Sequence, residues 1–258
     1  MSSILTEIQG QVLKITLNRP EKFNSFNREM SMQLQAALDS AANDKTIRCI
    51  YLSGEGKAFC AGQDLSEAID PAGPGIKNIV EEHYNPIIRK IREIEKPIVC
   101  AVNGIAAGAG ANIALACDVV MAASSASFLQ AFSKIGLIPD SGGTFFLPRL
   151  VGFGKASALM MLGDKVTATD AERMGMIYKV CEDANLAAEA MATATMLASM
   201  PTKGIGLTKR LLNQSMSNNL MEQLTAEATK QVIAASTFDY KEGVSAFLEK
   251  RKAVFKGE

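Results

Sequence analysis

The segment IVCAVNGIAAGAGANIALACDVVMAA (98–123) contains the order of elements that decides the fold. Residues 98–102 form an apolar, β-branched run that follows a proline and ends at an Asn-Gly pair, which is typical of a buried strand. Small residues at 109–117 then predict a helix, and 119–122 predict a second strand. The two asparagines and the many glycines and alanines favour a buried strand and helix over a membrane span.

The same alternation extends toward the N-terminus. The pattern predicts a half-buried strand at 12–17, a helix at 27–43 with Asn27 as its N-cap, and a strand at 47–53. Before the segment 98–123, a further helix is indicated by apolar residues that are mostly three or four positions apart: Ile76, Val80, Ile87, Ile91 and Ile94. Strands that alternate with helices predict the α/β class with parallel strands.

The last third of the chain is mainly helical. Thr169 and Glu172 have the spacing of a capping box, Gly175 predicts the end of that helix, and 177–181 predict one more short strand. From Ala184 onward the pattern is helical, with one interruption at Pro201 and Gly204.

These patterns divide the chain into two regions. We expect an α/β core at 1–195 that contains the active site, followed by a helical C-terminal region at 196–258. No repeat or low-complexity linker separates them. Such a helical region packs on its own core or on a neighbouring subunit.

Composition excludes several classes of protein. The 27 Lys and Arg residues balance 27 Asp and Glu residues, so we expect neither a general nucleic-acid partner nor an anionic membrane surface, although a local basic pocket stays open. The five cysteines are widely separated and predict reduced core residues in the cytoplasm or another reducing compartment. A single histidine and isolated thiols predict no metal site.

Three loops rich in small residues follow predicted strands, where α/β folds tend to bind ligands. They are AFCAGQDL (58–65), NGIAAGAGANIAL (103–115) and IGLIPDSGGTFFLPRLVG (135–152). Glycine and alanine let a ligand approach the backbone, and free N–H groups at a helix start stabilise negative charge. For any one loop alone, tight packing of helix and strand is an equally good interpretation.

Together with LNRPEKFNSFN (17–27), these loops resemble the crotonase, or enoyl-CoA hydratase/isomerase, superfamily over nearly the whole chain. The resemblance implies a spiral of ββα turns and a helical C-terminal region that assembles trimers, often stacked as hexamers. It also implies an acyl-CoA thioester as substrate. No separate cofactor is expected, because coenzyme A is part of that substrate.

The resemblance also implies roles for single residues. Ala61 and Ala109 match the two positions whose N–H groups form an oxyanion hole for the thioester enolate. The two glutamate positions of the hydratases hold Asn112 and Phe132, which cannot take a proton. Asp140 stands where several isomerases of the superfamily carry an acid. We therefore expect an isomerase in which Asp140 moves a proton.

The sequence around Asp140 allows two interpretations. Leu137, Ile138, Phe145 and Phe146 are apolar neighbours that could remove water from the carboxyl group and raise its pKa. On residue type alone, however, Asp140 would be an N-cap of the following helix.

Other residues are candidates for contacts with the acyl-CoA. We expect them in the backbone of the first two loops and in nearby polar or basic side chains, namely Lys22, Gly62, Gln63, Asp64, Leu65, Gly110 and Lys256. Each lysine is otherwise an ordinary solvated surface charge.

Competing functions remain. The run Asp140-Ser141-Gly142-Gly143 resembles the serine region of chymotrypsin-like proteases, but a triad needs a histidine, and we expect the only one, His83, to be a partly exposed helix residue. Asp118, between a helix and a strand, is interpreted as structural. A hydratase with non-standard acids and a non-catalytic acyl-CoA-binding subunit are the two further alternatives.

Overall fold

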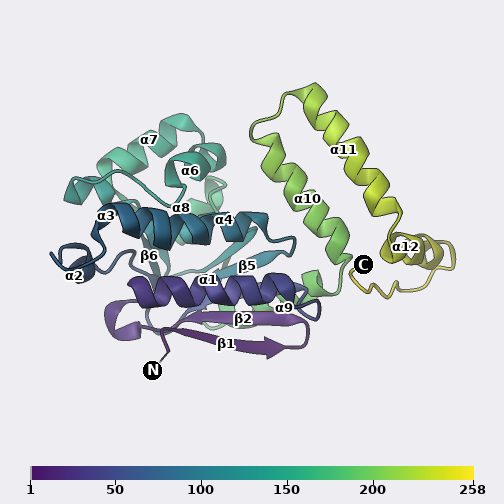
Figure 1. The fold of residues 1–258 in the computed structure, drawn as a ribbon, viewed down its shortest axis with the longest axis horizontal. Coiled ribbons are helices and arrows are strands. Elements are labelled where there is room, and N and C mark those ends of the chain that lie inside the picture. The colour runs from purple at the N-terminus through teal and green to yellow at the C-terminus, as the bar shows by residue number, and fades with distance from the viewer. Residues whose placement is uncertain (1) are drawn as a thin grey trace.

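The chain forms two β-sheets (Figure 1). Its strands alternate between the two sheets, so that β3, β5 and β7 are each followed by a strand of the second sheet. The computed structural model describes residues 2–258. The first sheet has the order β1-β2-β3-β5-β7-β10 and consists of β1 (Ile4–Gln9), β2 (Val12–Leu17), β3 (Cys49–Gly54), β5 (Ile98–Val102), β7 (Val119–Ala123) and β10 (Lys179–Cys181). The second has the order β4-β6-β8-β9 and consists of β4 (Ala58–Cys60), β6 (Ile105–Ala107), β8 (Ser127–Leu129) and β9 (Lys165–Thr167).

The repeating unit is two strands followed by helical structure. After the antiparallel pair β1 and β2, strands β3, β5 and β7 enter the first sheet in parallel, and β4, β6 and β8 continue them into the second. The helices and shorter helical turns are η1 (Pro20–Lys22), α1 (Arg28–Asn43), α2 (Leu65–Ala68), α3 (Gly75–Asn78), η2 (Ile79–Tyr84), α4 (Asn85–Glu93), α5 (Ala109–Leu115), η3 (Ala131–Ile135), α6 (Gly143–Val151), α7 (Phe153–Leu162), α8 (Ala168–Arg173), α9 (Leu186–Ala198), α10 (Thr202–Ser215), α11 (Leu220–Ala235) and α12 (Phe238–Leu248). The predicted α/β spiral of ββα turns is confirmed.

The central strands of the first sheet are buried on both faces, whereas the edge strand β1 is largely exposed. Helix α1 packs against β1 and β2, while α9 packs against β2, β3, β5 and β7 (Figure 1). Every residue of β5 is buried, which explains why 98–102 reads as a continuous apolar run. Strand β2, expected to be half-buried, is buried except at Lys14.

Two of the local sequence predictions need correction. Helix α8 is capped by Thr167, whose Oγ1 accepts the Asp170 N–H at 3.1 Å, so the predicted capping box at Thr169 is wrong. Glu172 instead accepts the Val180 N–H at 2.9 Å. Gly204 lies inside α10, so Pro201 alone marks the interruption. The Asn27 cap is confirmed, because its side chain accepts the Met30 N–H at 3.0 Å.

The predicted helix before β5 contains an unexpected π-helical turn, η2. The inward-facing residues there are Ile79, His83 and Tyr84, while Ile76 is exposed. A π-helical turn shifts the register of the helix face, so two consecutive residues, His83 and Tyr84, both enter the interior. The prediction that His83 is a partly exposed helix residue is therefore wrong, because its side chain is fully buried.

Helices α10, α11 and α12 stand beside the core, with the C-terminus near the base of α10 (Figure 1). Buried polar contacts attach α10: Lys209 Nζ lies 2.7 Å from the Asp118 carboxylate, which also accepts the Ile98 N–H at 2.9 Å. The structural interpretation of Asp118 is confirmed. The division at 195/196 falls inside α9 and stays a prediction.

The cysteines are all buried and free, as expected of reduced core residues. Burial raises the pKa of Cys49 and Cys60 to about 12, so these thiols stay protonated near neutral pH. Across residues 2–258, every helix is too short or too polar to span a bilayer.

Candidate active site

The first two small-residue loops lie against each other. Gly62 has a positive φ of 94°, and a methyl group added to it would lie 3.0 Å from the Ala107 carbonyl oxygen and 3.6 Å from the Ala109 nitrogen. A methyl group on Gly110 would lie 2.5 Å from the Cys60 carbonyl oxygen. Glycine is required at both positions because any side chain would separate the loops.

The third loop is attached to the second through Asn112. Its Nδ2 donates to the carbonyl oxygen of Asp140 at 2.8 Å, and its Oδ1 accepts from Gln130 Nε2 at 2.8 Å. Asn112 and Gln130 are both buried. The three loops therefore converge, and the asparagine at the first glutamate position of the hydratases positions the backbone of Asp140.

The predicted pair of free N–H groups is half correct. The Ala61 N–H donates to the Phe23 carbonyl oxygen at 2.9 Å, so it cannot bind an oxyanion, and the assignment to Ala61 is wrong. The N–H of Gln63 has no acceptor among residues 2–258. Ala109 is the first residue of α5, so its N–H has no acceptor within that helix, nor another among the described residues.

The free N–H group of the first loop is therefore that of Gln63 and not that of Ala61. Gly62, directly before Gln63, is the residue that lies against Ala109, so the two free N–H groups belong to neighbouring stretches of backbone. Backbone donors that are fixed before the reaction stabilise developing negative charge without reorganisation. Gln63 belongs to the predicted loop 58–65, but residue type does not show which N–H group of that loop is free.

Asp140, whose main-chain carbonyl oxygen accepts from Asn112, carries a half-buried carboxyl group. Burial raises the pKa of Asp140 above its ordinary value, and the Ser141 hydroxyl, which donates to Oδ1 at 2.9 Å, partly opposes that rise. The capping interpretation is wrong, because α6 begins after Gly142 and no side chain caps it. The Asp140 carboxyl group therefore does not cap the helix, and its one side-chain partner is the Ser141 hydroxyl.

The apolar neighbours that were expected to shield the Asp140 carboxyl group from water do so only in part. Leu137 and Ile138 are 42% and 82% exposed, so in the isolated chain they do not cover the carboxyl group. Phe145 is also exposed, while Phe146 is half-buried and lies near Gly142.

The other predicted substrate contacts divide into two groups. Gly62, Gln63 and Gly110 lie where the loops meet, and Leu65 is the exposed first residue of α2. Asp64 is already engaged: burial raises its pKa, but hydrogen bonds from Ser66 and Arg19 outweigh burial, so the pKa is lowered overall.

The two candidate lysines lie in different places. Lys22 is exposed and directly precedes Phe23, whose carbonyl oxygen accepts the Ala61 N–H. Lys256 belongs to the C-terminal segment, where its Nζ lies 4.2 Å from the centre of the Phe238 ring. Its described contacts do not join it to the three loops.

A serine-protease site is not formed. The Ser141 hydroxyl donates to Asp140, and neither ring nitrogen of His83 has a hydrogen-bond partner in the described part of the chain. Residues 2–258 also contain no group of three His, Cys, Asp or Glu side chains suited to a metal ion.

The geometry can be compared with known proteins. The model of the enoyl-CoA hydratase/isomerase family matches residues 7–258. The chain belongs to this family. Its three converging loops follow successive turns of the spiral.

Individual members of the family show its breadth. The chain is 48% identical to the 1,2-epoxyphenylacetyl-CoA isomerase of Escherichia coli K12, over 100% of both proteins. It is 33% identical to the short-chain-enoyl-CoA hydratase of Clostridium acetobutylicum, covering 98% of this chain and 97% of the relative. The crystal structure of an enoyl-CoA hydratase from Polaromonas sp. JS666 matches with a TM-score of 0.91 at 35% identity, covering 98% of this chain and 99% of that one.

Proposed function

We propose that this protein is an isomerase of acyl-CoA thioesters. The Asp140 carboxylate removes a proton next to the thioester carbonyl and returns it further along the acyl chain, which shifts a double bond from the 3 to the 2 position. The enolate oxygen formed in between accepts hydrogen bonds from the N–H groups of Gln63 and Ala109. One carboxylate suffices, because the carboxyl group that forms when it takes up the first proton can itself return a proton further along the chain.

This proposal rests on the two residues, Asn112 and Phe132, that stand where the resemblance places the glutamates of the hydratases. Asn112 uses its amide to hold the Asp140 backbone, and the Phe132 ring lies beside Gly108 at the start of the oxyanion helix. Neither side chain can activate water. This argues against the hydratase alternative, and the free backbone donors beside Asp140 argue against the non-catalytic alternative.

The substrate proposal is finer and rests on similarity. The 48% identity to a 1,2-epoxyphenylacetyl-CoA isomerase over the full chain supports ring 1,2-epoxyphenylacetyl-CoA as the native substrate and oxepin-CoA as its product. The stretch AFSKIGLIPDSGGTFFLPR (131–149), which contains Asp140, also resembles that enzyme. Phenylacetate degradation would be the corresponding pathway.

The proposed reaction is tested by incubating the protein with a 3-enoyl-CoA in deuterated water. Mass and double-bond position are followed together. Conversion to the 2-enoyl isomer without the mass of an added water supports the isomerase. A hydrated product would establish the hydratase alternative. If neither forms, the ring epoxide is the next substrate, and inactivity with both would leave the non-catalytic subunit.

The buried carboxyl group leads to a pH prediction. Only the Asp140 carboxylate accepts a proton, so kcat/KM is expected to fall on the acid side with an apparent pKa above the ordinary value of aspartic acid. The hydroxyl of Ser141 lowers the pKa, so Ser141→Ala should move this limb to higher pH. A pH–rate profile of both proteins checks this. An acid limb at the ordinary value, unmoved in the variant, would contradict it.

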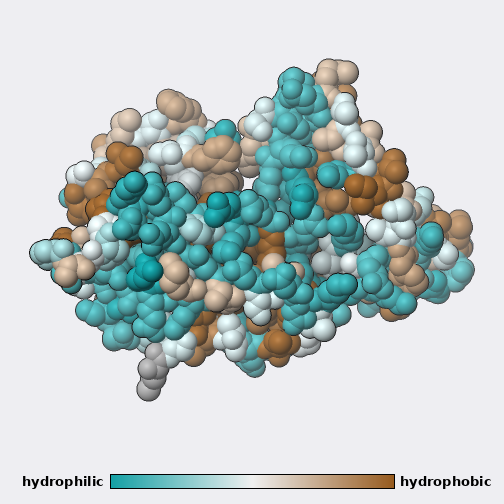
Figure 2. Space-filling view, in the orientation of Figure 1, coloured by the Kyte–Doolittle hydropathy of each residue, from teal (hydrophilic) through white to brown (hydrophobic). Residues whose placement is uncertain are grey.

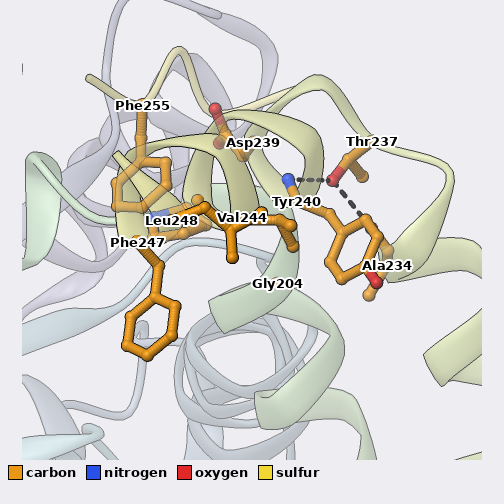
Figure 3. Close-up of a pocket in the computed structure, with 11 residues that line it drawn as sticks. Gly204, Ala234, Thr237, Asp239, Tyr240, Val244, Phe247, Leu248 and Phe255 are labelled. Atoms are coloured by element: carbon orange, nitrogen blue, oxygen red, sulfur yellow. Dashed lines mark hydrogen bonds between the residues drawn. The ribbon is translucent and has the colours of Figure 1, made fainter. Parts of the chain in front are cut away.

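We also propose that the chain assembles as a homotrimer or a dimer of trimers through its C-terminal region. Hydrophobic residues gather along α11 and beside α12 (Figure 2), where Leu220, Val232 and Phe247 are largely exposed. A cavity of about 430 Å³ lies between α12, Gly204 of α10 and Phe255 of the C-terminal segment (Figure 3). Apolar surface of this kind is costly in water and is covered by a second copy in an oligomer.

Light scattering is expected to give a mass of three or six chains. Phe247→Asp, which places a charge on the most exposed of these side chains, should lower that mass. A monomer at the concentrations used for activity assays would contradict the proposal.

A cytoplasmic or similarly reducing location agrees with the five free cysteines.

A further inference from the structure

The side chain of Gln63 is held at both ends. Its Oε1 lies 2.9 Å from the hydroxyl of Tyr84, and its Nε2 lies 3.0 Å from Oε2 of Glu67. Glu67 is itself anchored, because its Oε1 accepts the Arg28 N–H at 2.9 Å. A short chain of hydrogen bonds therefore runs from a buried phenol through Gln63 to a carboxylate.

The donors in this chain can be assigned. An ionised carboxylate only accepts hydrogen bonds, so the amide nitrogen of Gln63 must face Glu67. The amide oxygen then faces Tyr84, whose hydroxyl donates. Burial raises the pKa of Tyr84 well above its ordinary value, and the negative charge of Asp140 adds to the rise, so this hydroxyl keeps its proton.

The backbone on either side of Gln63 is fixed as well. The Phe26 N–H donates to the Gly62 carbonyl oxygen at 2.7 Å, and the Asp64 N–H donates to the Phe26 carbonyl oxygen at 2.8 Å. The rings of Phe26 and Tyr84 also touch, with centroids 5.8 Å apart. Phe26 thus holds the flanking peptides while Tyr84 holds the side chain between them.

The contact between Tyr84 and Gln63 starts from the π-helical turn. Tyr84 is its last residue, is fully buried and follows the equally buried His83. From this turn the phenol of Tyr84 reaches from the helix before β5 to the loop after β4.

We propose that Tyr84 is a positioning residue that orients the peptide N–H of Gln63 toward the thioester oxygen. This rests on the proposed function, in which that N–H is one of two oxyanion donors. Loss of the phenol hydroxyl releases one end of the Gln63 side chain and leaves the Gln63 peptide held by Phe26 alone, which weakens the hydrogen bond that strengthens as the enolate forms.

Tyr84→Phe tests this, because it keeps the ring and its contact with Phe26 and removes only the hydroxyl. We expect kcat for the 3-enoyl-CoA to fall roughly tenfold with KM changed less than about twofold, and the pH profile to stay unchanged. The matched control is Tyr51→Phe, which removes another buried tyrosine hydroxyl, on β3 and away from Gln63. It should leave kcat unchanged.

A second readout is independent of turnover. Binding of phenylacetyl-CoA labelled with ¹³C at its carbonyl should lower the thioester stretching frequency in an infrared difference spectrum. Tyr84→Phe should remove about half of that shift. Gln63→Leu, which also breaks the chain, should match Tyr84→Phe, and the double variant should lose no more than either single one.

The proposed isomerase activity and the proposed role of Tyr84 can be refuted independently of each other. If the wild type binds the thioester with a lowered carbonyl frequency and isomerises nothing, the isomerase is wrong and the positioning role stands or falls on the spectrum alone. If Tyr84→Phe lowers the melting temperature but keeps the wild-type frequency and kcat, Tyr84 is merely structural and the inference is overturned.

Discussion

Asp140→Asn is expected to lower kcat for conversion of a 3-enoyl-CoA to its 2-enoyl isomer by about 10³-fold, the usual range for loss of a general base. Asparagine has the size of aspartate but takes no proton. The carbonyl oxygen of residue 140 still accepts from Asn112, so the loop geometry is kept. Deuterium incorporation next to the thioester should fall in parallel, because the same carboxylate exchanges that proton.

The control for Asp140→Asn is Asp164→Asn, which changes an exposed carboxylate in the loop after α7 and should leave kcat unchanged.

The stability of Asp140→Asn provides a second check. The raised pKa means that the folded chain holds this proton more tightly than the unfolded chain, so the contribution to stability is lost as pH rises through that pKa. Asp140→Asn should therefore not lower the melting temperature at pH 7. Wild-type activity in the variant would refute the proton shuttle.

Gly110→Ala is expected to lower kcat/KM by about 10²-fold, comparable to loss of one oxyanion donor. The added methyl group would lie 2.5 Å from the carbonyl oxygen and 2.6 Å from Sγ of Cys60. Such contacts force the second loop away from the first, which separates the N–H of Ala109 from that of Gln63. Steady-state kinetics measure the loss, and the melting temperature should fall as well because the site is overpacked.

Gly154→Ala is the matched control for this change. Gly154 lies in α7, and a methyl group there would meet open space. Alanine stabilises a helix interior relative to glycine, so this variant should keep full activity and an equal or higher melting temperature. If Gly110→Ala behaved like Gly154→Ala, close approach of the two loops would not be needed for the reaction.

Much of the fold follows from local patterns. The apolar run at 98–102, the small-residue helix after it and the Asn27 cap all depend on interactions between near neighbours in the chain. The second sheet could not be predicted in the same way. Strands β4, β6, β8 and β9 have three residues each, too few for an alternating pattern to be recognised.

The errors at the site share one cause. Whether Ala61 or Gln63 has a free N–H depends on the Phe23 carbonyl oxygen, which comes from a distant loop. Burial of His83 depends on a π-helical turn that packs against α1, and exposure of Ile138 depends on the path of an irregular loop. Residue type and spacing contain no information about such contacts between distant segments.

By itself, the sequence determined which side chains are available for the proposed chemistry: a carboxyl group at Asp140, and an amide and a phenyl ring at 112 and 132, where the resemblance places the hydratase glutamates. These are properties of side-chain chemistry and need no fold. Only the tertiary structure decided that Gln63 and Ala109 supply the free N–H groups and that Tyr84 holds Gln63. A backbone donor is available only when no other part of the folded chain accepts from it.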